Sequence, residues 1–168
     1  MALKDWPDAG FPGTAINPAT LRAAVVDEAA CEQALSRTDD PADAVFVLLA
    51  RGRTAEAAEV AATARIKDPD SFRLQVLDAD ILGATRNTEP AVARLRRLAG
   101  AVVGTPEEAE VHLHLGKVHF SAGNYAAAVQ SFSRALDQRV AGDAGPALIY
   151  SSTVALGRAR DLADLATS

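Results

Sequence analysis

A glycine-marked turn between two helix-forming stretches recurs along this chain at nearly constant spacing. Gly123 and Gly157 are 34 residues apart, and so are Ala57 and Ala91, small residues that each follow a turn. Gly52 marks an equivalent turn earlier in the chain. A period of about 34 residues is typical of stacked helical hairpins, in which each unit buries its apolar face only against its neighbours. The sequence therefore predicts an all-α array rather than a single closed core.

The composition agrees with this fold class. Hydrophobic residues make up 49% of the 168 residues, which is enough for a continuous core, whereas aromatic residues make up only 5%. Alanine is abundant, has the highest helix propensity and lets helices approach one another closely. Glycine and proline lie at the boundaries of the helix-forming stretches, and strand-type alternation is scarce. We therefore expect an all-α fold.

Charge and hydropathy exclude several classes of function. The net charge of −5 and the lack of a long run of Lys or Arg argue against a nucleic-acid partner. No apolar run approaches the roughly 20 residues that span a bilayer, and the N-terminus lacks the features of a signal peptide. We expect a cytoplasmic protein without membrane contact, and the alanine and arginine content indicates a bacterial genome rich in GC. The single cysteine, Cys31, permits no intrachain disulfide.

Residues 1–17 form a segment in which prolines and glycines oppose a stable helix. The segment nevertheless carries three apolar side chains, those of Trp6, Phe11 and Ile16. We expect an extended arm that packs on the first helix; the alternative is an arm that occupies a groove, its own or a neighbour's. Asn17 and Pro18 then predict the start of a cap helix over residues 18–37, with Asn17 as N-cap and Pro18 at the first helical position.

Three helical hairpins are expected after this cap, over residues 38–71, 72–105 and 109–142. The turn of the first hairpin contains Gly52, which suits the left-handed C-cap position. The turn of the second, at residues 86–88, has no glycine where one is expected. The two helices around it fit the repeat best if the turn holds one extra residue. The assignment of residues 72–86 to repeat positions can therefore shift by one residue.

A partial repeat and a C-terminal cap are expected over residues 143–168. One helix covers residues 146–157 and ends at a turn marked by Gly157. A short closing helix over residues 158–168 presents a polar outer face, as the ends of repeat arrays do. Residues 18–168 then form a single domain.

The unit at residues 109–142 resembles the tetratricopeptide repeat family, which folds as a helix-turn-helix of about 34 residues. The matching positions are a large and a small residue in the first helix, the turn, and small and aromatic residues in the second helix: Leu115, Gly116, Gly123, Tyr125, Ala128, Phe132 and Ala135. Residues 38–71 match in register, and the remaining units match in part. The resemblance implies a right-handed α-solenoid of antiparallel hairpins with about three full repeats.

The resemblance also implies a binding function, because family members usually present the inner surface of their first helices as a concave groove for a peptide or a partner helix. Carried onto this sequence, the groove positions are Phe46, Leu49, Asp80, Leu113, Lys117, Phe120 and Ser151. Lys117 would pair with an acidic group of the partner and Asp80 with a basic one. The packing pattern of the family does not require large apolar residues at Phe46, Leu49 and Phe120. Either these side chains face a hydrophobic ligand, or the arm or a neighbouring helix covers them.

Catalytic motifs are missing from the sequence: it contains no nucleophile elbow, P-loop, His-Glu-x-x-His or Cys-x-x-Cys. His112 and His119 are about 10.5 Å apart along a helix and His114 points elsewhere, so the three cannot share one metal ion. We therefore expect a protein-binding scaffold without catalytic activity, cofactor or metal. The alternative is a self-associating structural solenoid, a homodimer in which the arm occupies the neighbour's groove.

Overall fold

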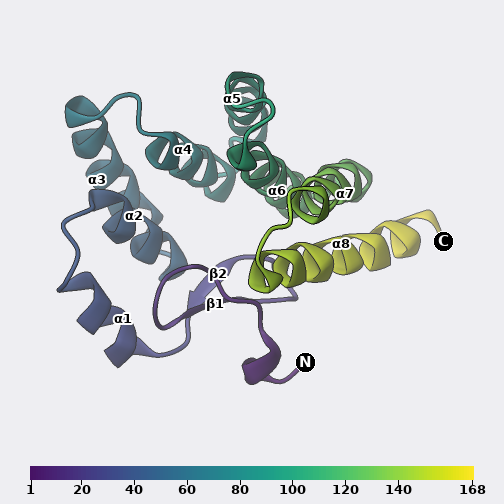
Figure 1. The fold of residues 1–168 in the computed structure, drawn as a ribbon, viewed down its shortest axis with the longest axis horizontal. Helices are drawn as coiled ribbons and strands as arrows, with labels where there is room; N and C mark the ends of the chain where they lie inside the picture. Colours follow the sequence, from purple (N-terminus) through teal and green to yellow (C-terminus); the bar gives the residue numbers. More distant parts are fainter.

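The computed structural model describes residues 1–168, of which 70% are helical, and the expected all-α class is confirmed. Eight α-helices follow one another: α1 (Glu28–Leu35), α2 (Pro41–Ala50), α3 (Thr54–Lys67), α4 (Phe72–Ala84), α5 (Thr88–Ala101), α6 (Pro106–Ser121), α7 (Tyr125–Ala141) and α8 (Pro146–Thr167). A short 3-10 helix (Leu3–Asp5) and an antiparallel strand pair, β1 (Thr14–Ile16) and β2 (Ala23–Val25), precede them. The helices follow an arc, and the N-terminal segment lies between α2 and α8 (Figure 1). None of the helices combines the length and hydrophobicity needed to cross a bilayer.

Three of the helix pairs, α2–α3, α4–α5 and α6–α7, are hairpins closed by the same turn. One residue of each turn is left-handed: Gly52 has a φ of 74°, Arg86 of 62° and Gly123 of 80°. The next residue donates its backbone N–H to the carbonyl five positions earlier at 2.8–2.9 Å, from Arg53 to Leu48, Asn87 to Leu82 and Asn124 to His119. Arg86 lies 34 residues after Gly52, so the second turn contains no extra residue and the phase of residues 72–86 follows directly from the first hairpin.

The left-handed Arg86 gives a test of this turn. An L-residue in that conformation costs roughly 1–2 kcal/mol, whereas glycine adopts it freely. We expect Arg86→Gly to raise the free energy of unfolding, measured by urea denaturation, by about 1 kcal/mol. The matched substitution Gly123→Ala should lower it by a similar amount, because an added Cβ meets no atom within 4 Å and only the backbone conformation opposes it. Two substitutions with effects of the same sign would contradict the shared turn geometry.

The core is divided into clusters along the array, as expected when each hairpin buries its apolar face against its neighbours. The cluster at the C-terminal end joins α6, α7 and α8 around Phe132, which is fully buried. Gly116 lies against this ring, since a Cβ there would be 2.4 Å from two of its carbons. The large residue at position 132 therefore depends on the absence of a side chain at position 116.

The cap helix predicted over residues 18–37 is wrong in its first part, because α1 begins only at Glu28. Asn17 and Pro18 start a tight turn instead: the Asn17 carbonyl accepts a hydrogen bond from the N–H of Leu21 at 2.7 Å, and Leu21 has a φ of 58°. This turn leads into β2, which pairs with β1. An Asn-Pro pair is suited to a turn as well as to a helix start, and the pairing of the two strands decided between them.

The turn predicted at Gly157 is also wrong, because α8 runs without a break from Pro146 to Thr167. Ala155 and Ala159, on either side of the glycine, are buried in the last cluster. One glycine inside a helix costs about 1 kcal/mol, which the packing of the flanking turns offsets. The predicted last helix and closing helix are thus a single helix.

Candidate binding hollow on the inner side of the array

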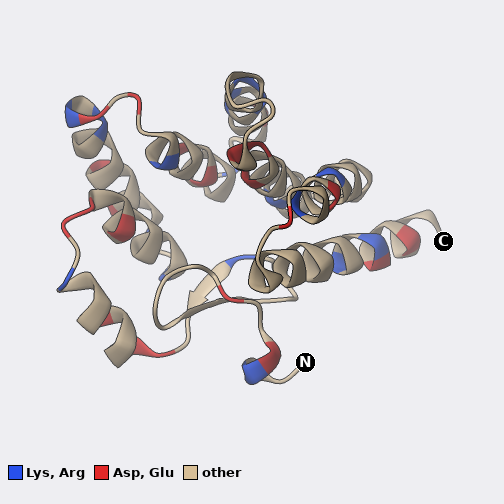
Figure 2. Ribbon diagram, in the orientation of Figure 1, with Lys and Arg blue, Asp and Glu red and all other residues tan.

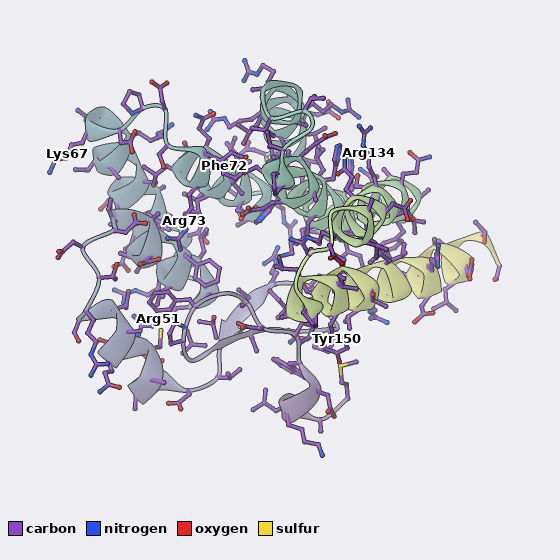
Figure 3. The ribbon with its side chains drawn as sticks, viewed as in Figure 1. Arg51, Lys67, Phe72, Arg73, Arg134 and Tyr150 are labelled. Atoms are coloured by element: carbon purple, nitrogen blue, oxygen red, sulfur yellow. The ribbon has the colours of Figure 1, made fainter.

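A hollow of about 950 Å³ lies on the inner side of the array. Its walls come from the first helix of each hairpin (α2, α4 and α6), from α8, from the end of α7 and from the N-terminal segment, whereas α3 and α5 contribute no residue. Figure 3 shows the side chains around this central space, with Arg73 on the α4 side and Tyr150 near the N-terminal segment. The volume is in the range of ligand-binding pockets, about 300–1,000 Å³.

Four of the seven predicted groove residues line the hollow: Phe46, Leu113, Lys117 and Ser151. Asp80 reaches it through His114, a lining residue whose Nδ1 is 2.8 Å from Asp80 Oδ1. Leu49 and Phe120 do not line it. Leu49 packs into the cluster of the first hairpin, and Phe120 is only 7% exposed, with its ring centroid 5.5 Å from that of Tyr125. Packing against neighbouring helices therefore accounts for these two residues.

Lys117 is the cation without a partner in the hollow. It is half-buried, and none of the ion pairs of the chain includes it. Burial lowers the pKa of Lys117, and the nearby carboxylate of Asp80 partly opposes that effect. An anionic group placed against this ammonium would reduce the cost of its burial. The position is thus suited to an acidic group of a ligand.

Several charged or ionisable lining residues are not among the positions that the repeat pattern selects, among them Arg73, Arg139 and His114. Arg73 pairs with Asp43 at 2.5 Å, and Arg139 donates to the Ser152 hydroxyl at 2.7 Å. Both arginines reach the hollow because partners on neighbouring helices hold them, which no local pattern reveals. His114 could have been placed in the hollow from the sequence, since it lies three residues before Lys117 and residues at that spacing share a helix face.

The N-terminal segment spans the inner side from the first hairpin to the last helix. Phe11 packs against Phe46 of α2, with ring centroids 6.4 Å apart. At the other end of the array, the Tyr150 hydroxyl donates to the backbone carbonyl of Asp5 at 2.7 Å. The N-terminal segment therefore contacts both ends of the array and covers part of its own chain's inner side.

The comparisons with known proteins bear on the two central hairpins. Residues 77–146 match a family model described as tetratricopeptide repeat. The match supports tetratricopeptide repeats in this part of the chain, residues 77–146. The matched range contains the turns at Arg86 and Gly123, and members of this family generally mediate protein–protein interaction. The searches of curated proteins and of solved structures returned no match.

A second hollow, of about 440 Å³, lies on another face of the tetratricopeptide hairpins, between α5 and α7. His112 and His119 of α6 both line it, and desolvation lowers the pKa of each imidazole. No group of three metal-ligating side chains occurs in the chain. Acidic and basic residues are interspersed along the helices (Figure 2).

Glu108 fastens the start of α6 to the connection between the tetratricopeptide hairpins. Its carboxylate accepts a hydrogen bond from the N–H of Gly104 at 2.9 Å and another from the guanidinium of Arg134 at 2.9 Å. These donors, Gly104 foremost, lower the pKa of Glu108 from 4.5 to about 2. Because the pKa is lower in the folded chain, the ionised carboxylate stabilises the fold above pH 4.5, and this contribution is lost as the pH falls towards 2.

We therefore expect Glu108→Gln to reduce the acid sensitivity of the fold. The free energies of unfolding of the wild type and the variant should differ most at neutral pH and converge between pH 4.5 and about 2. Urea denaturation across this range measures the difference. Glu107→Gln is the matched control, since Glu107 is exposed in the same turn of helix. A constant difference between wild type and Glu108→Gln across the range would contradict the assignment.

Proposed function

We propose that this chain is a non-catalytic module that binds a segment of a partner protein in the inner hollow. The observation that carries the proposal is the unpaired ammonium of Lys117, which lies in a hollow built by the first helices of the hairpins. A family that generally mediates protein–protein interaction gives the class of partner. The composition and charge of the chain favour a cytoplasmic, bacterial setting.

The hollow combines apolar walls with charged groups of both signs. Phe46 and Leu113 supply apolar surface, and Lys117 supplies a positive charge that belongs to no ion pair. The Asp80–His114 pair fixes the imidazole through Nδ1 and leaves Nε2 for another partner. This arrangement favours a segment in which an acidic residue lies next to apolar ones.

The charge at position 117 is the feature to test. The probes are peptides selected from a random phage library for binding to the wild-type chain. We expect them to bind Lys117→Glu at least about tenfold more weakly than the wild type, because the substitution turns an attraction into a repulsion. A tenfold loss of affinity corresponds to about 1.4 kcal/mol. Lys67→Glu makes the same change in net charge at an exposed lysine at the outer end of α3 (Figure 3) and should bind as the wild type does. Unchanged affinity for Lys117→Glu would remove this residue from the site.

A second candidate is self-association through the arm. The arm contacts both ends of the array, at Phe46 and at Tyr150, and the same contacts can form between two copies of the chain. Exchange of an identical element between protomers is a known route to dimers. Light scattering on the full chain and on a chain without residues 1–16 separates the two: a dimer that truncation converts to a folded monomer supports exchange, and a monomeric full chain opposes it.

A further inference from the structure

The second hollow lies between α5 and α7, and α6 packs against both of these helices beneath it. It shares only Glu108 with the inner hollow, so the two hollows are separate. Arg134 lies on this side of α7, away from the central space (Figure 3). The volume of about 440 Å³ is within the range of ligand-binding pockets, about 300–1,000 Å³. The second hollow is therefore large enough for a small molecule.

Two arginines from opposite walls give the second hollow its positive charge. Arg96 of α5 belongs to no ion pair. Arg134 of α7 pairs only with Glu108, through Nη2 at 2.9 Å. Glu108 is the only carboxylate among the lining residues, and it also accepts a hydrogen bond from the N–H of Gly104. The lining thus has two guanidinium groups and one carboxylate, which is already occupied.

Two histidines of α6 line the same hollow without a hydrogen-bond partner. His112 Nε2 and His119 Nδ1 are buried and form no hydrogen bond, although buried polar atoms in folded proteins nearly always do. The charged groups that face the two imidazoles are Arg134 and Glu108 at His112, and Arg96 and Glu89 at His119. Burial lowers the pKa of both imidazoles, the arginines lower it further, and the carboxylates oppose these shifts. An anion in the hollow would offset the charge of both arginines and favour protonation of both imidazoles.

We propose that the second hollow binds the phosphate group of a small organic molecule between Arg96 and Arg134. A phosphate group carries nearly two negative charges at neutral pH and three acceptor oxygens, which match the planar donor edges of guanidinium groups. Gln130 and Ser131 add hydrogen-bond donors on the α7 wall. The apolar lining residues are Ala99, Val103, Leu115 and Ala127. They supply surface for the organic part of the ligand, and neither Lys117 nor the proposed partner segment is involved.

Phenyl phosphate, which joins a phosphate group to a small apolar ring, is the probe. In an NMR titration of the full chain, we expect saturable shifts of the Cε1–H signals of His112 and His119. His114 lines the inner hollow, so its signal should stay in place and serves as an internal reference. The pKa of His112 and of His119 should rise in the saturated complex. Inorganic phosphate should compete with phenyl phosphate, whereas phenol should not bind.

Arg96→Gln should weaken the binding of phenyl phosphate at least about fivefold, because a charge-assisted donor is lost. Arg97→Gln removes the same charge from an exposed neighbour outside the hollow and should bind as the wild type does. Both arginines are exposed, and circular dichroism checks that both variants are folded. Lys117→Glu should also bind phenyl phosphate as the wild type does, which distinguishes failure of this site from failure of the proposed function.

Four results would each overturn the proposal. They are the lack of saturable binding to the wild type, equal affinity of Arg96→Gln and Arg97→Gln, shifts at His114 alone, and binding of phenol equal to that of phenyl phosphate. The third would place the anion in the inner hollow, and the fourth would make the site one for an apolar ring.

Discussion

Phe132→Ala is expected to lower the free energy of unfolding by about 3–5 kcal/mol, a large fraction of the stability of a domain of this size. The ring is fully buried in the cluster that joins α6, α7 and α8, and truncation leaves a cavity that close-packed helices refill only in part. Urea denaturation with a constant m-value measures the loss. Ile66→Ala removes a large apolar side chain that is 85% exposed and should change stability by less than about 0.5 kcal/mol. A similar, small loss in both variants would contradict the packing of the last repeat.

Gly116→Val is expected to cost about 1–3 kcal/mol, because the new Cβ would be 2.4 Å from the Phe132 ring and the ring has no free space to enter. The cause can be checked with a double-mutant cycle. Phe132→Leu replaces the ring with a smaller side chain. Gly116→Val should therefore lower the free energy of unfolding clearly less in that background than in the wild type. Equal costs in the two backgrounds would show that the glycine is needed for another reason.

The hairpins could be predicted from the sequence because their determinants are local. Turn residues, small residues after each turn and apolar residues at helical spacing lie within one repeat, and stacking needs only neighbouring repeats. The turn at Arg86 lacks a glycine, yet it forms the same backbone hydrogen bond as the turns at Gly52 and Gly123, from the next residue to the carbonyl five positions earlier. An arginine does not favour the left-handed conformation by itself, so the packing of α4 on α5 imposes it.

The two ends of the chain could not be predicted in the same way. Asn17 and Pro18 fit a helix start, but pairing between β1 and β2 makes them a turn. Gly157 fits a repeat turn, but burial of Ala155 and Ala159 continues the helix through it. In both places the tertiary contacts outweigh a local preference of about 1 kcal/mol or less.

The candidate site was predictable in part for a related reason. The repeat pattern placed Phe46, Leu113, Lys117 and Ser151 on one side of the array, and they line the hollow. The same pattern selected Leu49 and Phe120, which neighbouring residues cover. The sequence alone does not say where the N-terminal segment lies, and Leu21, in the turn between β1 and β2, packs in the cluster that contains Phe120.

Site-specific photo-crosslinking tests the central claim, that a partner segment binds in the inner hollow, most directly. Phe46→p-benzoylphenylalanine keeps the phenyl ring and adds a photoreactive benzoyl group in the wall of the hollow, and the same group at Ile66 places it on the exposed outer side. Irradiation in cells, followed by mass spectrometry, identifies what each position touches. We expect a defined protein product from position 46 and none from position 66. A product from position 66 with none from position 46 would contradict the claim.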